Sequence, residues 1–419
     1  MRPIWVSLLI WAGVLACIPV VEHGREWTEQ WMPKGEDLSD EIVGMEDIDE
    51  IDTTILADVT PEEEYEAPEA VGLDGFFAAL KGADTMSVRV AHYGDSQIEE
   101  DRITSILRLH LQDQYGGDGV GLIPMHQTIP TRTLRQRLYL SGEPQTVGGG
   151  PKRYLVFGPK EMRLEDKLYG PMGQVAVMDN ELVEGSEDAR LELTPLKVPN
   201  YKRAFRHSMV RLLADSSIRM TEEEDGVHLR GKGRVYGLML DSKTGVHVDN
   251  IPMRGCLGTV FSEMDANQLR RYFRDENVRL IILQYGGNFV AGAKTEGGIR
   301  SAVSGLRMQV RLLRRLAPEA SILFIGQGDM LRKGESGELE TNPLVPYMDR
   351  LLAKMAEEEK IAYYSLYHAM GGSGSMLEWQ EKGWAASDGV HFSQRGADKA
   401  GEELWEWLNQ ETSWSEEKR

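Results

Sequence analysis

The sequence predicts an α/β protein with a doubly wound parallel sheet and an inserted all-β sandwich domain. Segments typical of strands and helices alternate along residues 232–410, as in parallel sheets that carry helices on both faces. The nearly continuous apolar run at 279–285 indicates a strand buried on both faces. Over 125–231, short alternating stretches separated by turn residues predict the inserted sandwich or jelly roll.

The first 25 residues are predicted to be a secretory signal or a membrane anchor. Met1 and Arg2 supply positive charge, and residues 4–21 are largely apolar. We favour an uncleaved anchor because a good small-residue cleavage site is missing. A bacterial lipoprotein is the alternative, because residues 14–17 loosely resemble a lipoprotein cleavage box that ends at Cys17. Either prediction implies an exported protein of the bacterial cell envelope, periplasmic or attached to the membrane by this segment.

Residues 26–72 are predicted to form an acidic linker. From Glu36 to Glu69 there are fifteen Asp or Glu residues and no Lys or Arg, without helical or strand periodicity. Such a segment repels itself and is typical of a disordered spacer; an acidic binding site is the alternative. The net charge of the whole chain is −20, and no basic stripe offsets it. This charge argues against nucleic acid as a partner.

Neither a metal site nor a cofactor is predicted. The nine histidines are scattered, and none belongs to a zinc-binding pattern such as H-E-x-x-H. Cys17 and Cys256 cannot cross-link the domain if Cys17 lies in the anchor, which fits bacterial export of a protein stabilised by a large core. The glycine-rich stretch 116–124 lacks the lysine of a phosphate-binding loop and is predicted to be a turn.

Ser96 is the candidate nucleophile. It lies in the first part of the α/β domain, residues 73–124, where the predicted strand 87–93 is followed by Gly94-Asp95-Ser96 and a helical pattern that continues to Tyr115. A hydroxyl in this position is at the carboxyl edge of a sheet and near the positive end of a helix dipole, which suits a nucleophile and the oxyanion it creates. On this stretch alone, a helix-capping serine is the alternative.

The remaining α/β elements bring further candidates to the same edge of the sheet. Ligands bind at the carboxyl ends of strands in such sheets, and Gly255 and Asn288 follow two predicted strands as Ser96 follows the first. A tail is expected at 411–419. The predicted strands of this second part are 234–241, 246–250, 279–285, 321–326 and 361–366, and the predicted helices are 262–275, 298–316, 344–358 and 394–408.

Asp388 and His391 lie in a loop before the last helix. The aspartate comes three residues before the histidine, so its carboxylate can hydrogen-bond the imidazole, fix the tautomer and stabilise the imidazolium. Alone, the pair is equally typical of a helix-capping loop. Together with Ser96 and with donors at two later strand ends, it predicts an acyl-transfer site.

Four short blocks resemble those of the SGNH (GDSL-type) hydrolases and occur in the order found in that family. The four blocks are Gly94-Asp95-Ser96, the turn at Gly255, Gly286-Gly287-Asn288 and Asp388-Gly389-Val390-His391. The chain departs from the family pattern in three places: Gln97 stands where many members have leucine, the residues before Gly255 are untypical, and Phe289 replaces the aspartate that ends the third block.

The resemblance implies a flavodoxin-like three-layer fold over about 85–123 and 232–410. Residues 92–101 are similar to a segment of bacterial peptidoglycan O-acetylesterases. Those enzymes carry a β-sandwich inserted after the first block, which resembles a carbohydrate-binding module. The resemblance therefore implies that the insert at 125–231 binds carbohydrate.

The resemblance further implies a catalytic triad of Ser96, His391 and Asp388. The oxyanion would be bound by the backbone N–H groups of Ser96 and Gly255 and by the side-chain amide of Asn288. We expect a serine esterase that removes small acyl groups, O-acetyl above all, from an acetylated glycan such as peptidoglycan or another extracellular polysaccharide. A polysaccharide O-acetyltransferase and a non-catalytic glycan-binding protein are the alternatives. The binding protein is favoured slightly by Phe289 and by the untypical residues around the glycine turn at Gly255.

Overall fold

The computed structural model describes residues 72–125, 127, 129–139, 145–147, 153–157, 170–179, 189–214 and 217–417. These residues belong to one compact unit of the chain. The predicted signal or anchor, with Cys17, and all but the last residue of the predicted acidic linker lie outside the described residues. Within the described part, no helix has both the length and the hydropathy needed to cross a bilayer.

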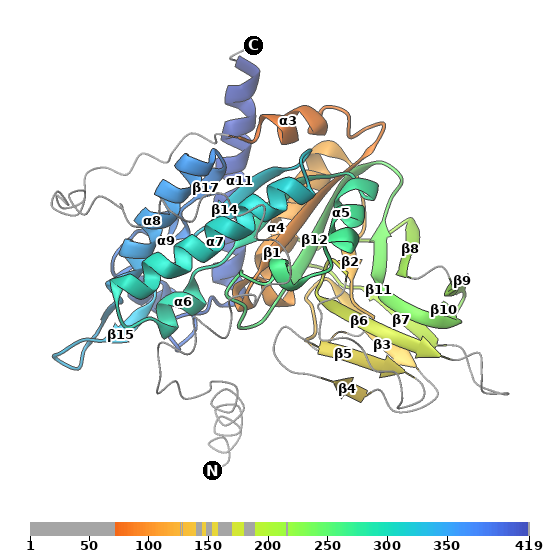
Figure 1. Cartoon of the computed structure of the whole chain (residues 1–419), viewed down its shortest axis with the longest axis horizontal. Coiled ribbons are helices and arrows are strands. Elements are labelled where there is room, and N and C mark those ends of the chain that lie inside the picture. Colours follow the sequence, from red (N-terminus) through yellow and green to blue (C-terminus); the bar gives the residue numbers. More distant parts are fainter. Residues whose placement is uncertain are drawn as a thin grey trace, which may run out of the picture. The chain divides into compact units, whose positions relative to one another are not determined.

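A five-stranded parallel sheet forms the centre of the α/β part (Figure 1). The strands lie in the order β12-β1-β13-β14-β17. Numbered along the chain as parallel strands, this order is 2-1-3-4-5, the flavodoxin-like arrangement of a doubly wound sheet. The predicted fold class is thus confirmed. The strands are β1 (Ser87–Gly94), β12 (Gly245–Pro252), β13 (Val278–Gln284), β14 (Ser321–Ile325) and β17 (Ala362–Tyr364).

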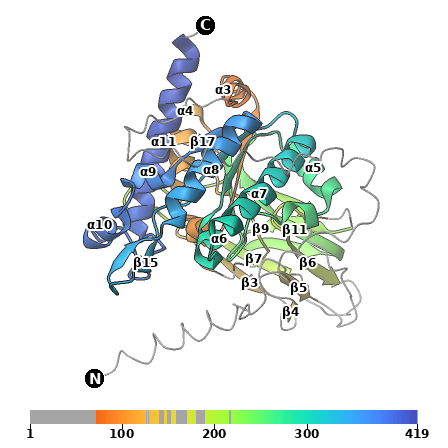
Figure 2. The same cartoon turned by 60° about the vertical axis from the view of Figure 1, so that its left-hand side comes forward.

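Helices cover both faces of this sheet and bury two separate apolar clusters (Figure 2). Because side chains alternate along a strand, Val90 of β1 joins one cluster and Ala91 joins the other. α5 (Ala266–Asp275), α7 (Glu296–Leu316) and α8 (Leu344–Glu359) pack on the Ala91 face, and α3 (Asp74–Leu80), α4 (Arg102–Tyr115) and α11 (Gln394–Glu417) pack on the Val90 face.

Shorter elements connect these helices and strands. They are η3 (Ser96–Asp101), η4 (Phe261–Glu263), α6 (Gly287–Gly292), β15 (Leu331–Lys333), β16 (Leu339–Thr341), α9 (Leu366–Met370) and α10 (Ser375–Glu381).

The predicted C-terminal tail, residues 411–419, is wrong as far as residue 417, because the backbone of α11 stays helical up to that residue.

The insert consists of two sheets that enclose a third apolar cluster, as the predicted sandwich requires. One sheet has the order β3-β7-β10-β9, and the other has the order β2-β11-β6-β5-β4 with β8 paired to β11. The strands are β2 (Gly121–Ile123), β3 (Leu134–Tyr139), β4 (Gln145–Val147), β5 (Arg153–Phe157), β6 (Gln174–Asp179), β7 (Ala189–Pro195), β8 (Met209–Ala214), β9 (Arg219–Glu223), β10 (Gly226–Arg230) and β11 (Lys232–Asp241).

Residues 234–241 are a strand, but their predicted place in the parallel α/β pattern is wrong. They form most of β11, which pairs antiparallel with β2, β6 and β8. Val235, Leu238 and Leu240 of this strand belong to the apolar cluster of the insert. An apolar strand can pair in either sheet, and here the neighbouring strands of the insert determine the partner. The sheet of the insert therefore extends beyond residues 125 and 231 on both sides.

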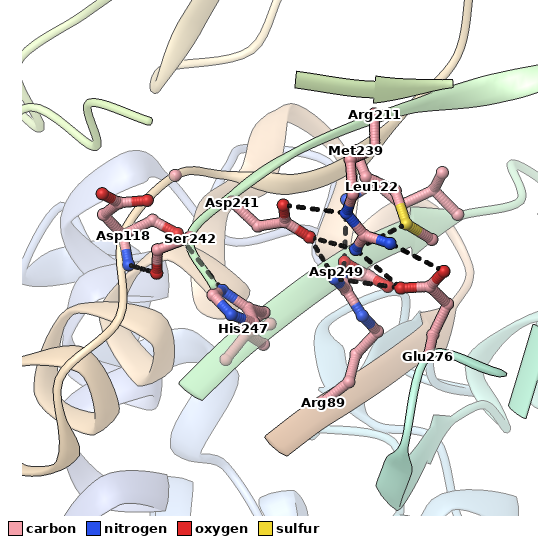
Figure 3. Close-up of polar contacts among 12 residues, drawn as sticks. Arg89, Asp118, Leu122, Arg211, Met239, Asp241, Ser242, His247, Asp249 and Glu276 are labelled. Atoms are coloured by element: carbon pink, nitrogen blue, oxygen red, sulfur yellow. Dashed lines mark hydrogen bonds and ion pairs between the residues drawn. The ribbon is translucent and has the colours of Figure 1, made fainter. Parts of the chain in front are cut away.

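A buried ionic cluster joins the insert to the parallel sheet (Figure 3). Arg89 of β1 is fully buried, and its guanidinium binds Asp241 at the end of β11 and, at 2.7 Å, Asp249 of β12. Arg211 of β8 binds Asp241 at 2.6 Å and Glu276, just after α5, at 2.7 Å. Opposite charges from four strands and one helix end thus meet at one junction.

Candidate active site

The carboxyl ends of neighbouring parallel strands bring the predicted site residues to one edge of the sheet. Gly94 at the end of β1 is aligned with Pro252 at the end of β12 and with Gln284 at the end of β13. The chain continues from β1 to Ser96 and from β13 to Asn288. This edge includes the point where the strand order reverses, which is where ligands bind in open α/β sheets.

Ser96, His391 and Asp388 form a chain of hydrogen bonds. The Oγ of Ser96 lies 2.9 Å from Nε2 of His391, and Nδ1 of His391 lies 2.8 Å from Oδ2 of Asp388. At these distances the imidazole can take the hydroxyl proton while the carboxylate holds the other ring nitrogen. The structure therefore brings together the three residues that were predicted as a triad, although 295 positions separate Ser96 from His391 in the sequence.

Asp388 is held as a carboxylate. Partial burial opposes its ionisation, but three hydrogen bonds favour it. One comes from the ring of His391, and the backbone N–H groups of Val390 and His391 each donate another at 2.9 Å. Together they lower the pKa of Asp388 to about 2. The group is thus ionised at neutral pH and can stabilise a positively charged imidazolium.

The turn before Ser96 is fixed by Asp95 and Gly94. Asp95 Oδ1 accepts a hydrogen bond from the backbone N–H of Gln97 at 2.9 Å and so caps η3. Burial raises the pKa of Asp95 to about 6. A Cβ at Gly94 would lie 3.2 Å from the carbonyl oxygen of Gln284, so the close approach of β1 and β13 favours glycine there.

The predicted helix after Ser96 begins later than expected. Ser96 starts the short 3₁₀ helix η3, and α4 begins only after Asp101. Glu100 and Asp101 have φ values of 62° and 61°, a left-handed conformation that non-glycine residues rarely adopt. Arg108 binds the Asp101 carboxylate at 2.6 and 3.1 Å, and the Glu100 carbonyl accepts from the backbone N–H of Arg132 at 3.0 Å. These contacts stabilise the strained turn.

Asn288 lies between the other predicted oxyanion donors. Its side-chain amide donates to Oδ2 of Asp95 and to the carbonyl of Cys256, each at 3.1 Å. It therefore bridges the segment of Ser96 and the turn of Gly255. Because both amide protons have protein acceptors here, binding an oxyanion would require one of them to turn towards the substrate. Direct oxyanion binding by Asn288 stays a prediction.

Gly255 lies on an exposed turn after β12. Its φ of 71° is in the left-handed region that favours glycine, and no described atom lies within 4 Å of the position that a Cβ would take. The adjacent Arg254 binds the carboxylate of Glu99 at 2.8 and 2.6 Å, which ties this turn to η3. Ser96 begins η3, where backbone N–H groups have no partner within the helix.

Two side chains that contact the loop of His391 are missing from the predicted site. Gln97 donates to the carbonyl of Val390 at 2.7 Å. Arg102 donates to the carbonyls of Ser96 at 2.8 Å and of Phe392 at 3.0 Å. Both residues bind backbone carbonyls, which every residue carries, so no pattern of residue types points to these contacts. The one signal for a role in the site is that both residues follow Ser96 closely in the sequence.

His92 lies in the strand that leads to Ser96 but faces the interior. Its Nδ1 is 2.9 Å from Thr104 Oγ1, and its Nε2 is 3.1 Å from Gln284 Oε1. Burial lowers the pKa of His92 to about 3, so the ring is neutral at physiological pH. It links β1 to α4 and β13 by hydrogen bonds.

Glu223, Asp225 and His228 place three potential metal-ligand atoms within 4.8 Å of one another on the β9–β10 hairpin. His228 Nε2 already lies 2.7 Å from Asp225 Oδ1, and the two acidic residues are exposed. Exposed acidic groups gather in this way without an ion as well. We therefore assign no metal site to this hairpin.

Comparison with known proteins identifies the α/β part. Residues 221–399 match the model of the GDSL-like lipase/acylhydrolase family. This region contains three of the four blocks, whereas Ser96 lies before it, on the other side of most of the insert. No curated protein matches the chain.

A solved structure of a peptidoglycan O-acetylesterase has the same fold. It is 20% identical to this chain with a TM-score of 0.63, and the alignment covers 83% of this chain and 99% of that one. A protein from Lactobacillus plantarum is 21% identical with a TM-score of 0.30, and the alignment covers 39% of this chain and 81% of that one. An acetyl xylan esterase is 13% identical with a TM-score of 0.28, and the alignment covers 38% of this chain and 80% of that one. Residues 221–399 are thus similar to the GDSL-like lipase/acylhydrolase family, and the chain shares its fold with this peptidoglycan O-acetylesterase.

Proposed function

We propose that this protein is a serine esterase that removes O-acetyl groups from a cell-wall or extracellular polysaccharide. The observation that carries the proposal is the hydrogen-bonded chain from Ser96 through His391 to Asp388 at the carboxyl edge of the sheet. A hydroxyl, an imidazole and an ionised carboxylate in this arrangement are the groups that two-step acyl transfer requires.

In the first step, Nε2 of His391 takes the proton of Ser96 as Oγ attacks the ester carbonyl carbon. Asp388 holds the resulting imidazolium, and donors at the ends of β1, β12 and β13 stabilise the tetrahedral oxyanion. His391 then gives its proton to the departing sugar hydroxyl, and the acyl group stays on Ser96. In the second step, water attacks the acyl-enzyme with His391 as base, and acetate leaves.

The proposed substrate class is supported by one similar structure and by one feature of this molecule. The solved relative with the same fold is a peptidoglycan O-acetylesterase. In addition, a pocket beside the site is lined by residues of both the insert and the α/β part, among them Leu122, Glu99 and Arg254. Sugar units next to the acetylated one could contact both parts of the molecule at this pocket.

The N-terminal segment completes the proposal. If residues 1–25 direct export and hold the chain at the membrane, the acidic segment after them carries the esterase domain away from the bilayer. The enzyme then acts on glycans of the bacterial cell envelope, which lie outside the cytoplasm.

Labelling with a serine-reactive fluorophosphonate tests the proposal. We expect the probe to modify Ser96 of the intact protein, as mapped by peptide mass spectrometry, and we expect Ser96→Ala to abolish both the labelling and the hydrolysis of p-nitrophenyl acetate. Free acetate released from O-acetylated peptidoglycan would identify hydrolysis, and an acetylated acceptor glycan would identify a transferase instead. Absence of wild-type labelling, or full activity of Ser96→Ala, would rule out the proposed enzyme.

A further inference from the structure

We infer that Gln97 and Arg102 are positioning residues that hold the loop of His391 against the segment of Ser96 and thereby set the distance between hydroxyl and imidazole. The inference rests on the proposed function, because it concerns the geometry of that same site. Neither side chain contacts the reacting atoms of Ser96 or His391. Each binds a backbone carbonyl next to His391 in the chain.

Gln97 holds the residue before the base. Its Nε2 donates to the carbonyl of Val390 at 2.7 Å. The backbone of Gln97 is itself fixed, because its N–H donates to Asp95 Oδ1 at 2.9 Å. The amide therefore projects from a rigid turn, one residue after Ser96, to the peptide group that immediately precedes His391.

Arg102 holds the residue after the base. Its side chain is largely buried, and all three guanidinium nitrogens donate to backbone carbonyls. Nε binds Glu99 at 3.0 Å, one terminal nitrogen binds Ser96 at 2.8 Å, and the other binds Phe392 at 3.0 Å. A planar guanidinium keeps its donors in a fixed fork. Arg102 thus joins the carbonyl of the nucleophile directly to that of the residue after the base.

Other contacts of this loop do not perform the same task. His391 donates to the Asp388 carboxylate, and the backbone N–H of Ala386 donates to the His391 carbonyl at 2.8 Å. Both contacts lie within the loop. Leu331 N–H donates to the Gly389 carbonyl at 2.9 Å, which anchors the loop to another part of the fold. The His391 side chain is 36% exposed, so packing alone does not fix its distance from Ser96.

The expected consequence is a loss of turnover without a loss of substrate binding. A misplacement of about 1 Å can reduce the rate by roughly 10²-fold. We therefore expect Gln97→Met, which keeps the side-chain length but lacks the amide donors, to lower kcat by about 10- to 100-fold with KM unchanged. The rate of fluorophosphonate labelling at Ser96 should fall in parallel, because it depends on the same activation by His391.

Gln380→Met is the matched control for Gln97→Met. Gln380 also donates its Nε2 to a carbonyl of this loop at 2.7 Å, but the acceptor is Ala386, five residues before His391. A purely structural role of such bonds would make the two variants alike in both stability and activity. We expect similar shifts in Tm, but a large fall in kcat only for Gln97→Met.

Arg102→Met and Arg102→Lys test the second contact. Lys keeps the charge and can reach only one carbonyl at a time, so it should recover part of the kcat that Met loses. Exposed Arg395, in the first turn of α11, serves as control through Arg395→Met, which should keep wild-type kcat. If Arg102→Met does not fold, Gln97→Met and Arg102→Lys still decide the question.

The outcomes separate this inference from the proposed function. If wild type is active and labelled at Ser96 but Gln97→Met and Arg102→Lys both retain full kcat, the positioning role is overturned and the esterase stands. The same holds if Gln380→Met loses as much kcat as Gln97→Met. If wild type itself is neither active nor labelled, the proposed function fails first.

Discussion

Asn288 occupies a position from which it can affect both sides of the site. Its amide bridges Asp95 and Cys256, and it is the predicted side-chain donor for the oxyanion. Loss of one oxyanion donor typically lowers turnover by about 10²–10³-fold, so we expect a loss of this size in kcat for Asn288→Ala. Hydrolysis of p-nitrophenyl acetate measures it. A variant within threefold of wild type would show that Asn288 only bridges the two segments.

Asp388 should make the stability of the protein depend on pH in acid. Its pKa in the folded state is about 2, below the ordinary value of 3.8 that applies to the unfolded chain. A lowered carboxylate pKa contributes stability that is present above the unfolded value and is lost as the pH falls through the folded one. In Asp388→Asn this contribution is absent at every pH.

We therefore expect the difference in free energy of unfolding between wild type and Asp388→Asn to shrink as the pH falls from about pH 4 to about pH 2. Urea unfolding at a series of pH values measures this difference. A difference that stays the same throughout this range would contradict the lowered pKa.

At the scale of elements, the break between η3 and α4 stores strain next to the nucleophile. Left-handed backbone costs a non-glycine residue about 1–2 kcal/mol, whereas glycine adds about 0.5–1 kcal/mol of unfolded-state entropy. For Glu100→Gly we expect the first effect to dominate and to raise the free energy of unfolding by about 0.5–1 kcal/mol.

Glu357→Gly provides the opposite case. Glu357 is exposed in α8, where glycine brings no relief of strain, so we expect a loss of about 1 kcal/mol. Chemical denaturation of both variants measures the two changes. Destabilisation by Glu100→Gly comparable to that of Glu357→Gly would show that the left-handed turn carries no strain.

At the scale of the whole molecule, the buried ionic cluster at the junction holds the insert and the sheet together (Figure 3). Arg89→Met would leave the buried carboxylates of Asp241 and Asp249 without their shared partner. Breaking a buried ion pair in this way typically costs about 3–5 kcal/mol, and we expect a destabilisation of that size.

The control for Arg89→Met is the exposed pair of Arg274 with Asp275 at 2.7 Å. Exposed pairs contribute roughly 0–1 kcal/mol, so Arg274→Met should leave Tm almost unchanged. Thermal unfolding of both variants measures the contrast. Equal Tm values for the two variants would mean that the cluster adds nothing to the stability of the junction.

Elements with local signals were predictable from the residue pattern. The apolar run at 279–285 corresponds to β13 because a strand covered on both faces needs apolar side chains at every position, and it ends at the same edge as β1. The Asp388–His391 contact was predictable because its signal is local too: a spacing of three residues lets these side chains meet within one loop. The four blocks occur in the order found in one family, and this resemblance indicated the expected fold.

Contacts between residues far apart in the chain were not predictable from the residue pattern and became known from the folded structure. Whether β11 pairs in the insert or in the parallel sheet depends on which strands lie beside it, and its own apolar residues fit both. The pattern of residue types in β1 does not show what Arg89 binds, because its partner Asp241 lies 152 residues later in the chain. Likewise, Gln97 and Arg102 bind backbone carbonyls, which every residue carries, so their contacts with the His391 loop become visible only once the chain is folded.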